Sequence, residues 1–326
     1  MPSPTSPSSA VWREAQPRRF RLSGIAELGI FVGFVLMLLV FGLSSKYFFT
    51  VENLLNIAKQ SSIIAVIAFG MTLVIISGGI DLSVGSVVAL SAVMMATLMK
   101  TGLSPALSVA LGFGVGIVAG LLNGLFIARI RLAPFIVTLG SMSSLRGLGL
   151  VFTKGMPVYG VPAGIRFIGN GSLWVIPIPV LIVLAMVVVS TFLLRRTHFG
   201  EYATAMGGNE EATRLAGVNV TGYKTLVYVF SGACSVLGAI ILMARINAAE
   251  PIAGMGYELD AIAAAVMGGT SLSGGVGSMI GTVFGALVIA GLRNGLNILN
   301  VDANWQQVAI GVVIMLAVIT DRFRKK

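Results

Sequence analysis

Long apolar segments alternate with short polar segments along most of the chain. An α-helix needs about 17 to 25 predominantly apolar residues to cross the hydrocarbon of a bilayer, so each apolar segment is a candidate membrane span. We predict ten spans, near residues 26–43, 61–78, 82–99, 105–128, 134–153, 173–194, 223–244, 257–269, 277–298 and 305–321. The alternating ten-residue segments of a transmembrane barrel do not occur in the sequence, so the pattern predicts an all-α, polytopic membrane helix bundle.

One of these segments, 257–269, is too short to cross a bilayer comfortably and is bounded by glycines. Irregular backbone at membrane depth is tolerated only where protein covers it. We therefore interpret this segment as a half-helix or a re-entrant segment inside the bundle.

Two similar heptapeptides, "AGLLNGL" at 119–125 and "AGLRNGL" at 290–296, fall in the fourth and ninth predicted spans. A spacing of five spans is typical of an inverted repeat of five plus five helices. A second similar pair, "GGIDLSVG" at 78–85 and "GGTSLSGG" at 268–275, is six spans apart and does not fit that scheme. Chance similarity among small residues is the alternative explanation.

Composition places the chain in a membrane. It is 56% hydrophobic and 10% charged, whereas soluble domains have about 25% charged residues. The net charge of +10 does not indicate nucleic-acid binding, because the basic residues cluster at the ends of apolar segments: Arg13, Arg18, Arg19 and Arg21; Arg129 and Arg131; Arg195 and Arg196; Arg322, Arg324, Lys325 and Lys326. The positive-inside rule places these clusters and both termini in the cytoplasm, and ten crossings agree with that placement.

The first residues differ from the rest of the chain. "MPSPTSPSSA" is rich in proline and serine, so we predict a disordered, basic cytoplasmic tail over 1–24, followed by a single transmembrane domain over 25–326. No A-x-A cleavage site follows the first apolar segment, which we interpret as a retained span rather than a signal peptide. The lone Cys234 cannot form an intrachain disulfide.

The longest polar stretch between spans is 195–223, and it contains one short helix signature. Asn209 is a helix-capping residue, Glu210 and Glu211 follow in the first turn, and Gly217 can end the helix. A helix of this length is marginal alone in water, so it needs a partner surface. Lipid headgroups are one candidate, but the helix buries little apolar area and carries two carboxylates, which favours a cytoplasmic protein partner.

The segment "FGEYATAMGGNEEATRLAGVNV" at 199–220 resembles the cytoplasmic coupling loop in permease subunits of bacterial ribose-type ABC importers. Three further blocks resemble the same family in order and spacing: "FFTVENLLNIAKQSSIIAVIAFGMTLVIISGGIDLSVGS" at 48–86, "GYELDAIAAAVMGGTSLSGGVGSMIGT" at 256–282 and "LRNGLNIL" at 292–299. The first 20 residues and 154–172 match less clearly.

The resemblance implies a division of labour among subunits of the inner membrane. The sequence has no G-x-x-x-x-G-K-[ST] phosphate loop, so ATP and Mg would be bound by a separate cytoplasmic ATPase and not by this chain. A periplasmic solute-binding protein and a second permease copy, identical or a close paralogue, would complete the importer. The resemblance further implies that Glu210, Glu211, Arg214 and Leu215 enter an ATPase groove, with Asn209 capping the helix and Gly207, Gly208 and Gly217 shaping its ends.

Asp81 is the most notable acid near a span, because an ionisable group in the membrane is costly. Together with Ser83 it could bond to sugar hydroxyls or gate a pathway, or it could cap the helix that we predict to begin at Leu82. Glu258 and Asp260 present the same choice at the outer face, where they could contact the binding protein or cap the short eighth segment.

Other polar residues admit simpler explanations. Asn123 and Asn294 could line the pathway or form hydrogen bonds between helices. Arg293 lies near a span end, where its side chain can snorkel toward water. The single His198 has no partners at metal-ligand spacing, and no catalytic motif occurs, so we predict neither a metal site nor an enzyme.

Three classes of function remain at this stage. The first is an importer permease for a ribose-like or other monosaccharide, and the second is an ion-gradient-driven secondary transporter of a small neutral solute. A polytopic membrane enzyme is the third. The sequence leaves the sugar itself open.

Overall fold

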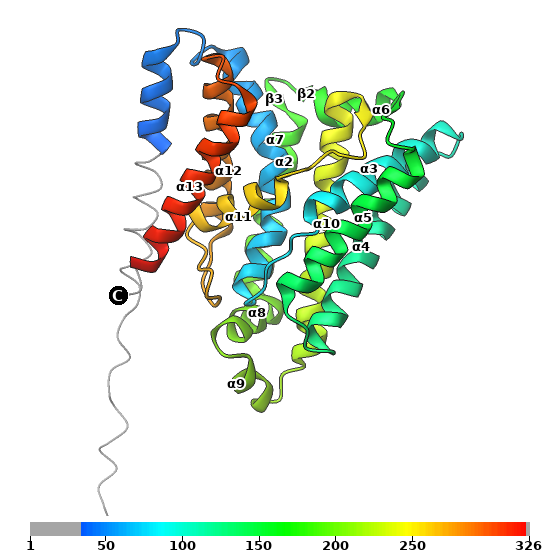
Figure 1. Cartoon of the computed structure of the whole chain (residues 1–326), viewed down its shortest axis with the longest axis vertical. Coiled ribbons are helices and arrows are strands. Elements are labelled where there is room, and N and C mark those ends of the chain that lie inside the picture. The colour runs from blue at the N-terminus through cyan, green and yellow to red at the C-terminus, as the bar shows by residue number, and fades with distance from the viewer. Residues whose placement is uncertain (1–33, 324–326) are drawn as a thin grey trace, which may run out of the picture.

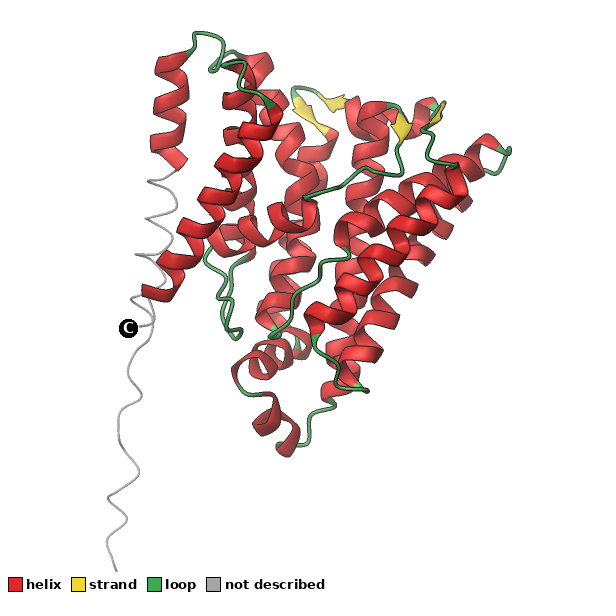
Figure 2. Cartoon of the chain, viewed as in Figure 1, coloured by secondary structure: helices red, strands yellow, loops and turns green. Residues whose placement is uncertain are grey.

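The computed structural model describes residues 34–323 as a bundle of helices with two short two-stranded sheets (Figures 1 and 2). A helix at Phe34–Ser44 comes first. It is followed by α2 (Val51–Ile76), α3 (Val84–Lys100), α4 (Pro105–Ala128), α5 (Pro134–Thr153), α6 (Ala163–Asn170), α7 (Ile178–Arg196), α8 (His198–Gly208), α9 (Glu210–Leu215), α10 (Val220–Ile246), α11 (Tyr257–Met267), α12 (Met279–Ile298) and α13 (Ala303–Phe323). The antiparallel sheets pair β1 (Val158–Tyr159) with β4 (Ala248–Ala249) and β2 (Ser172–Leu173) with β3 (Ile176–Pro177).

The helical bundle agrees with the predicted fold class. Among the described residues, six helices are long and apolar enough to cross a membrane, namely α2, α4, α5, α7, α10 and α12, and shorter apolar helices occur at Phe34–Ser44, Val84–Lys100 and Ala303–Leu316. The predicted tail 1–24, the start of the first span and both chain ends lie outside the described residues. The short helices α6 and α8 and the two sheets were not predicted.

The second predicted span begins earlier than its apolar pattern indicates. We predicted a start near residue 61, but α2 begins at Val51, and the Thr50 side chain accepts a hydrogen bond from the Asn53 amide at its first turn. The polar residues before Gln60 lie outside the predicted span. They are helical because they meet polar partners on α10 and α12, described below.

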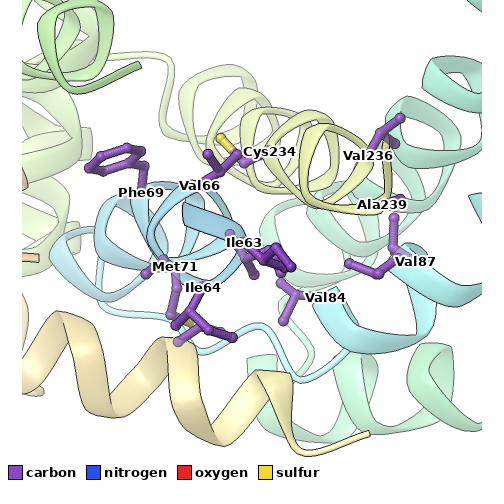
Figure 3. Packing of buried hydrophobic residues seen from close by; sticks show 14 of the residues in the cluster. Ile63, Ile64, Val66, Phe69, Met71, Val84, Val87, Cys234, Val236 and Ala239 are labelled. Carbon is purple, nitrogen blue, oxygen red and sulfur yellow. The ribbon is translucent and has the colours of Figure 1, made fainter. Parts of the chain in front are cut away.

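Helices α2 and α10 form the centre of the bundle. Of the most apolar 18 residues of α2, 89% are buried, against 17% in α5 and α7. Figure 3 shows Val66 of α2 beside Cys234 of α10, with Val84 and Val87 of α3 completing the core. At the crossing, a Cβ on Gly70 would lie 2.7 Å from the Cα of Ser231, so glycine permits the close approach.

Two helices, α3 and α11, begin inside the bundle rather than at its ends. The chain runs without helix from Ser77 to Ser83 before α3, and it descends past Gly254 before α11. A Cβ on Gly85 would lie 2.2 Å from the Gly254 carbonyl oxygen, which places the starts of α3 and α11 against each other. The short helix expected at 257–269 is therefore present as α11, covered by protein as such a segment must be.

The two ends of the bundle differ (Figures 1 and 2). Helices α8 and α9 and the connection between α4 and α5 lie at one end. The two sheets, α6 and the turn between α12 and α13 lie at the other. Arg129, Arg131, Arg195 and Arg196 lie together at the end that carries α9, which is the end predicted to be cytoplasmic.

Candidate functional site

Helices α8 and α9 meet at Asn209, which ends one helix and caps the next. Asn209 has an extended backbone, and its side-chain oxygen accepts a hydrogen bond from the Ala212 amide at 2.9 Å. The helix is only six residues long, and Gly217 follows with a φ of 85°, which glycine adopts without strain. The sequence thus correctly predicted the cap and the terminating glycine, although the helix is shorter than 209–217.

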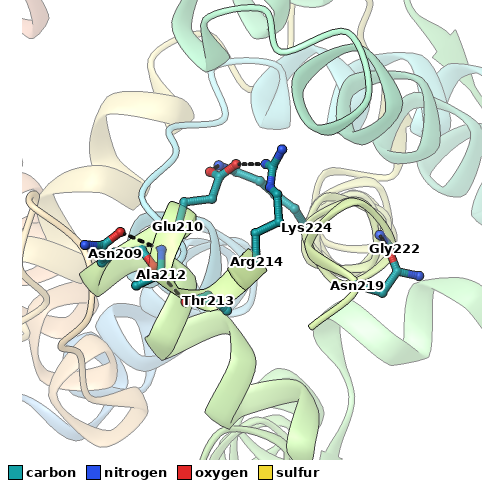
Figure 4. Close-up of polar contacts among 8 residues, drawn as sticks. All are labelled: Asn209, Glu210, Ala212, Thr213, Arg214, Asn219, Gly222 and Lys224. Carbon is teal, nitrogen blue, oxygen red and sulfur yellow. Dashed lines mark hydrogen bonds and ion pairs between the residues drawn. The ribbon is translucent and has the colours of Figure 1, made fainter. Parts of the chain in front are cut away.

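Glu210 faces the bundle and anchors α9 to α10 (Figure 4). Its carboxylate accepts hydrogen bonds from Arg214 at 2.9 Å and from Lys224 of α10 at 2.5 Å. The Glu210 and Arg214 side chains are 36% and 29% exposed, so this pair is engaged within the chain. Sequence analysis missed Lys224, although a lone lysine near the start of an apolar helix is a signal for a nearby acid.

The opposite face of α9 has no partner among residues 34–323. Glu211, Ala212 and Ala216 are exposed on it, and Leu215 is 81% exposed. Helix α9 lies at the end of the bundle, away from the flanks of the long helices (Figure 1). Of the four residues predicted to enter an ATPase groove, Glu211 and Leu215 are exposed on this face, whereas Glu210 and Arg214 pair with each other within the chain.

We expect the Glu210 cluster to make stability depend on pH. Burial raises the pKa of Glu210, but the hydrogen bond from Lys224 and the positive charges of Lys224 and Arg214 outweigh burial, so the pKa lies below its ordinary value of 4.5. A depressed folded-state pKa stabilises the fold above the unfolded pKa, and the contribution is lost as the pH falls through the folded-state pKa. Glu210→Gln should therefore lower the unfolding temperature at neutral pH, with a smaller difference from the unchanged protein below pH 4.5.

Thermal unfolding of the purified protein across pH tests this expectation. Glu211→Gln is the matched control, because Glu211 is exposed and forms no ion pair in the described part of the chain. A Glu210→Gln difference that stays constant across pH would contradict the role of the ionised cluster.

Gly207 joins α8 to two other segments. A Cβ on Gly207 would lie 1.8 Å from the carbonyl oxygen of Ile76, the last residue of α2, and 2.6 Å from the amide nitrogen of Gly275. The Gly275 amide donates a hydrogen bond to the same Ile76 oxygen at 2.8 Å. The end of α8 therefore packs on the end of α2 and on the loop that links α11 to α12. Gly208, which the sequence treated as equivalent, is exposed with nothing near its Cβ position.

Asp81 lies in a buried polar cluster with both oxygens engaged. It is 2% exposed; Oδ1 accepts hydrogen bonds from the Ser83 amide at 3.0 Å and the Ser83 hydroxyl at 2.6 Å, and Oδ2 accepts one from Ser231 of α10 at 2.8 Å. Asn123 of α4 donates to the Ser83 hydroxyl at 3.0 Å and accepts a hydrogen bond from Ser141 of α5. Helix α3 begins at Val84 rather than Leu82, so the Asp81 carboxylate binds the amide of Ser83, the residue just before the helix. The cluster joins the start of α3 to α4, α5 and α10.

Asn294 forms a reciprocal amide pair with Asn53. The two side chains exchange hydrogen bonds of 2.9 and 2.8 Å, which join α12 to the first turn of α2. The geometry matches hydrogen bonding between helices, one of the two interpretations of this residue.

We expect this amide pair to be worth about 1 kcal/mol of stability. Asn294→Ala and Asn53→Ala should each lower the free energy of unfolding, and the double variant should lose less than the sum, because a shared interaction is removed once. Unfolding of the four proteins in one detergent measures the coupling. Strict additivity of the two single effects would show that the pair contributes nothing.

Glu258 and Asp260 lie inside the bundle rather than at the outer face where the sequence placed them. Asp260 is 1% exposed and pairs with Arg293 of α12 at 2.7 Å. Glu258 accepts a hydrogen bond from the Gly256 amide at 3.2 Å, at the start of α11. The position differs from the prediction because the segment before α11 descends into the bundle, and Arg293 is paired rather than extended toward water.

His198 and Cys234 take part in no cluster of metal-ligating side chains in the described part of the chain. His198 is 79% exposed in its side chain and lies 3.0 Å from Glu201. Cys234 is buried. Within residues 34–323, no group of three or more His, Cys, Asp or Glu side chains could hold a metal ion.

Comparisons with known proteins agree with this geometry. Residues 53–318 match the family described as the permease component of branched-chain amino acid transport systems. The ribose import permease protein RbsC of Bacillus subtilis is 42% identical over 312 residues, 95% of this chain and 97% of that protein. RbsC of Escherichia coli K12 is 41% identical over 93% of this chain and 96% of its own length. The L-arabinose transport system permease protein AraH of the same strain is 34% identical over 92% of both chains, and no solved structure matches.

These matches run through the helices of the bundle and through α9. The family description refers to amino acids, whereas the similar proteins are named for sugars. Such proteins are transport subunits rather than enzymes, and they are multi-pass proteins of the inner membrane. The chain belongs to this family of ABC importer permeases, among its ribose-type monosaccharide members.

Proposed function

We propose that this chain is the membrane subunit of an importer for a ribose-like monosaccharide, driven by a separate ATPase that docks on the exposed face of α9. The observation that carries the proposal is the geometry of α9. Glu210 and Lys224 hold the helix in place, while Glu211 and Leu215 face outward with no partner in the described chain. A short helix held rigidly with one free face is suited to transmit a push from a partner.

The contacts of α8 supply the path for that push. ATP binding would draw two ATPase subunits together and move α9. Because Gly207 packs on Ile76 and Gly275, the movement would reach the end of α2 and the loop after α11 directly. In this proposal ATP and Mg are bound by the ATPase, a periplasmic binding protein delivers the sugar to the opposite end, and a second permease copy completes the pathway.

We also propose the inverted repeat of five plus five spans. Exchanging the first five spans for the last five maps α4 onto α12, α3 onto α11 and α10 onto α2. The packing supports this relation: α4 packs on α10 as α12 packs on α2, and α3 packs on α4 and α10 as α11 packs on α12 and α2. The starts of α3 and α11, which meet at Gly85 and Gly254, are equivalent under the same exchange.

Reconstitution into vesicles tests the proposal against the secondary-transporter alternative. The chain, its ATPase and its binding protein, loaded with D-ribose, should take up sugar only with ATP present. Omission of the ATPase should abolish uptake, and an ionophore should leave uptake unchanged. Uptake by the chain alone that an ionophore abolishes would instead establish transport driven by an ion gradient.

A further inference from the structure

A small cavity lies between α2, α10, α11 and α12, away from the coupling helices. Its volume is about 70 Å³, room for about two water molecules at the density of liquid water. Four aliphatic side chains from α2 and α12 form part of the wall. The rest is polar or aromatic, and comprises Gln60, Arg245, Tyr257, Asp260 and Arg293.

The polar groups of this cavity come from four separate helices of an otherwise apolar bundle. Asp260 and Arg293 bond to each other at 2.7 to 2.9 Å, which joins α11 to α12. Arg245 takes no part in that pair. It lies in the last turn of α10 and donates a hydrogen bond to Asn56 of α2 at 3.0 Å. Ionisable groups at membrane depth are costly and mark solute pathways by default.

Hydrogen-bonding capacity is left over at the cavity. Nε of Arg293 is buried and has no hydrogen-bond partner. Arg245 forms no ion pair with any acid in residues 34–323, and a guanidinium offers five donors, of which Asn56 takes one. The side chain of Gln60 adds a carbonyl acceptor, and its amide is placed by a 3.4 Å contact with the Asn56 oxygen.

This combination matches one class of ligand. Hydroxyl groups both donate and accept, so adjacent hydroxyls can bond to a guanidinium and to a carboxylate at the same time. The ring of Tyr257 and the aliphatic wall offer a surface for the C–H side of a sugar ring. A fully apolar solute would leave the arginine donors without partners, whereas a polyol offers acceptors to the guanidinium groups and donors to the Asp260 carboxylate.

We propose that this cavity is a transit site within the permease that binds the hydroxyl groups of a neutral monosaccharide, through Arg245, Asp260, Arg293 and Gln60, as the sugar passes between α2, α11 and α12. The inference rests on the proposed function, because it assigns the sugar pathway of that same importer. Because the cavity is smaller than a whole monosaccharide, it binds only one side of the sugar ring. The binding protein recognises the whole molecule.

Transport measurements on the complete importer test the transit site separately from the proposed importer function. Arg245→Gln should reduce D-ribose uptake about tenfold or more, the loss expected for a hydrogen bond to a charged group. ATP hydrolysis stimulated by the loaded binding protein should persist, because α9 and the binding protein are unaltered. Lys59→Gln is the matched control: it removes one positive charge next to Gln60 without lining the cavity, and it should leave uptake unchanged.

Cysteine protection gives a readout that does not depend on uptake. In a Cys234→Ser background, Ala290→Cys places a thiol in the cavity wall, and methyl methanethiosulfonate should modify it. High millimolar D-ribose, L-arabinose or D-allose should slow the modification, while a cysteine at the 94% exposed Trp174 should react equally with and without sugar. No modification of Ala290→Cys, or modification that none of the three sugars slows, would overturn the transit site. If the loaded binding protein fails to stimulate ATP hydrolysis by the complex without substitutions, the proposed function is overturned instead.

Discussion

Replacing Gly207 by alanine is expected to reduce ATP-driven uptake at least tenfold, whereas the same change at Gly208 leaves uptake intact. The added Cβ at Gly207 would lie 1.8 Å from the Ile76 carbonyl oxygen and 2.6 Å from the Gly275 nitrogen, both of them backbone atoms. Backbone cannot rotate away as a side chain would, so α8 must shift and the hydrogen bond between Gly275 and Ile76 is strained. Overpacking of this kind costs about 1 to 3 kcal/mol.

The neighbouring residue supplies the control for this prediction. Nothing lies within 4 Å of a Cβ added to Gly208, which is exposed at the end of the same helix. Alanine there should be neutral or slightly stabilising, by about 0.5 to 1 kcal/mol from helix propensity. Thermal unfolding measures the stability of the two variants, and vesicle uptake measures their transport. Gly207→Ala that unfolds and transports like the unchanged protein would show that the junction of α8, α2 and the loop after α11 is not tight.

Asp81→Ala is expected to prevent accumulation of folded protein, whereas Asp81→Asn preserves the fold and most of the transport. Alanine leaves the Ser83 amide, the Ser83 hydroxyl and the Ser231 hydroxyl without their acceptor in a buried site. Each stranded group costs about 1 to 3 kcal/mol. Asparagine retains an oxygen for Ser83, and its amide can donate to Ser231 once that hydroxyl rotates.

This pair of variants separates a structural carboxylate from an ion-coupling one. A transporter driven by protonation of Asp81 would keep its fold with asparagine and lose transport, because asparagine carries no titratable proton. Yield from detergent-solubilised membranes and uptake in vesicles measure the two properties. Folded Asp81→Asn protein without uptake would contradict the structural role and favour the ion-gradient alternative.

Helix ends marked by local signals could be predicted from the sequence. The predicted spans 105–128 and 134–153 coincide with α4 and α5; Ser104 caps α4 and Pro105 follows at its first position, and Pro134 stands at the start of α5. The cap of α9 at Asn209 depends on one residue and its neighbours, so it too could be predicted. Such signals act within a few residues and need no knowledge of the tertiary fold.

Partners distant in the sequence could not be predicted. Asn53 lies outside the predicted second span, and its partner, Asn294, is 241 residues away in the sequence. Asp260 appeared to lie at the outer face because the descent of the preceding segment is a tertiary feature. Glu210 was read with Glu211 as part of one contact surface, whereas the contact with Lys224 turns it inward. In each case a long-range hydrogen bond decided the orientation of a polar side chain.

Cysteine labelling at Leu215 tests the central claim most directly. Leu215→Cys in a Cys234→Ser background should resist a membrane-impermeant maleimide in intact cells and react in inside-out vesicles, since Leu215 is 81% exposed at the predicted cytoplasmic end. A cysteine at Trp174, at the opposite end, should behave in the reverse way. Addition of the ATPase subunit to the vesicles should then protect the Leu215 position from the maleimide. Labelling of Leu215→Cys from outside intact cells, or labelling that the bound ATPase leaves unchanged, would contradict the coupling role of α9.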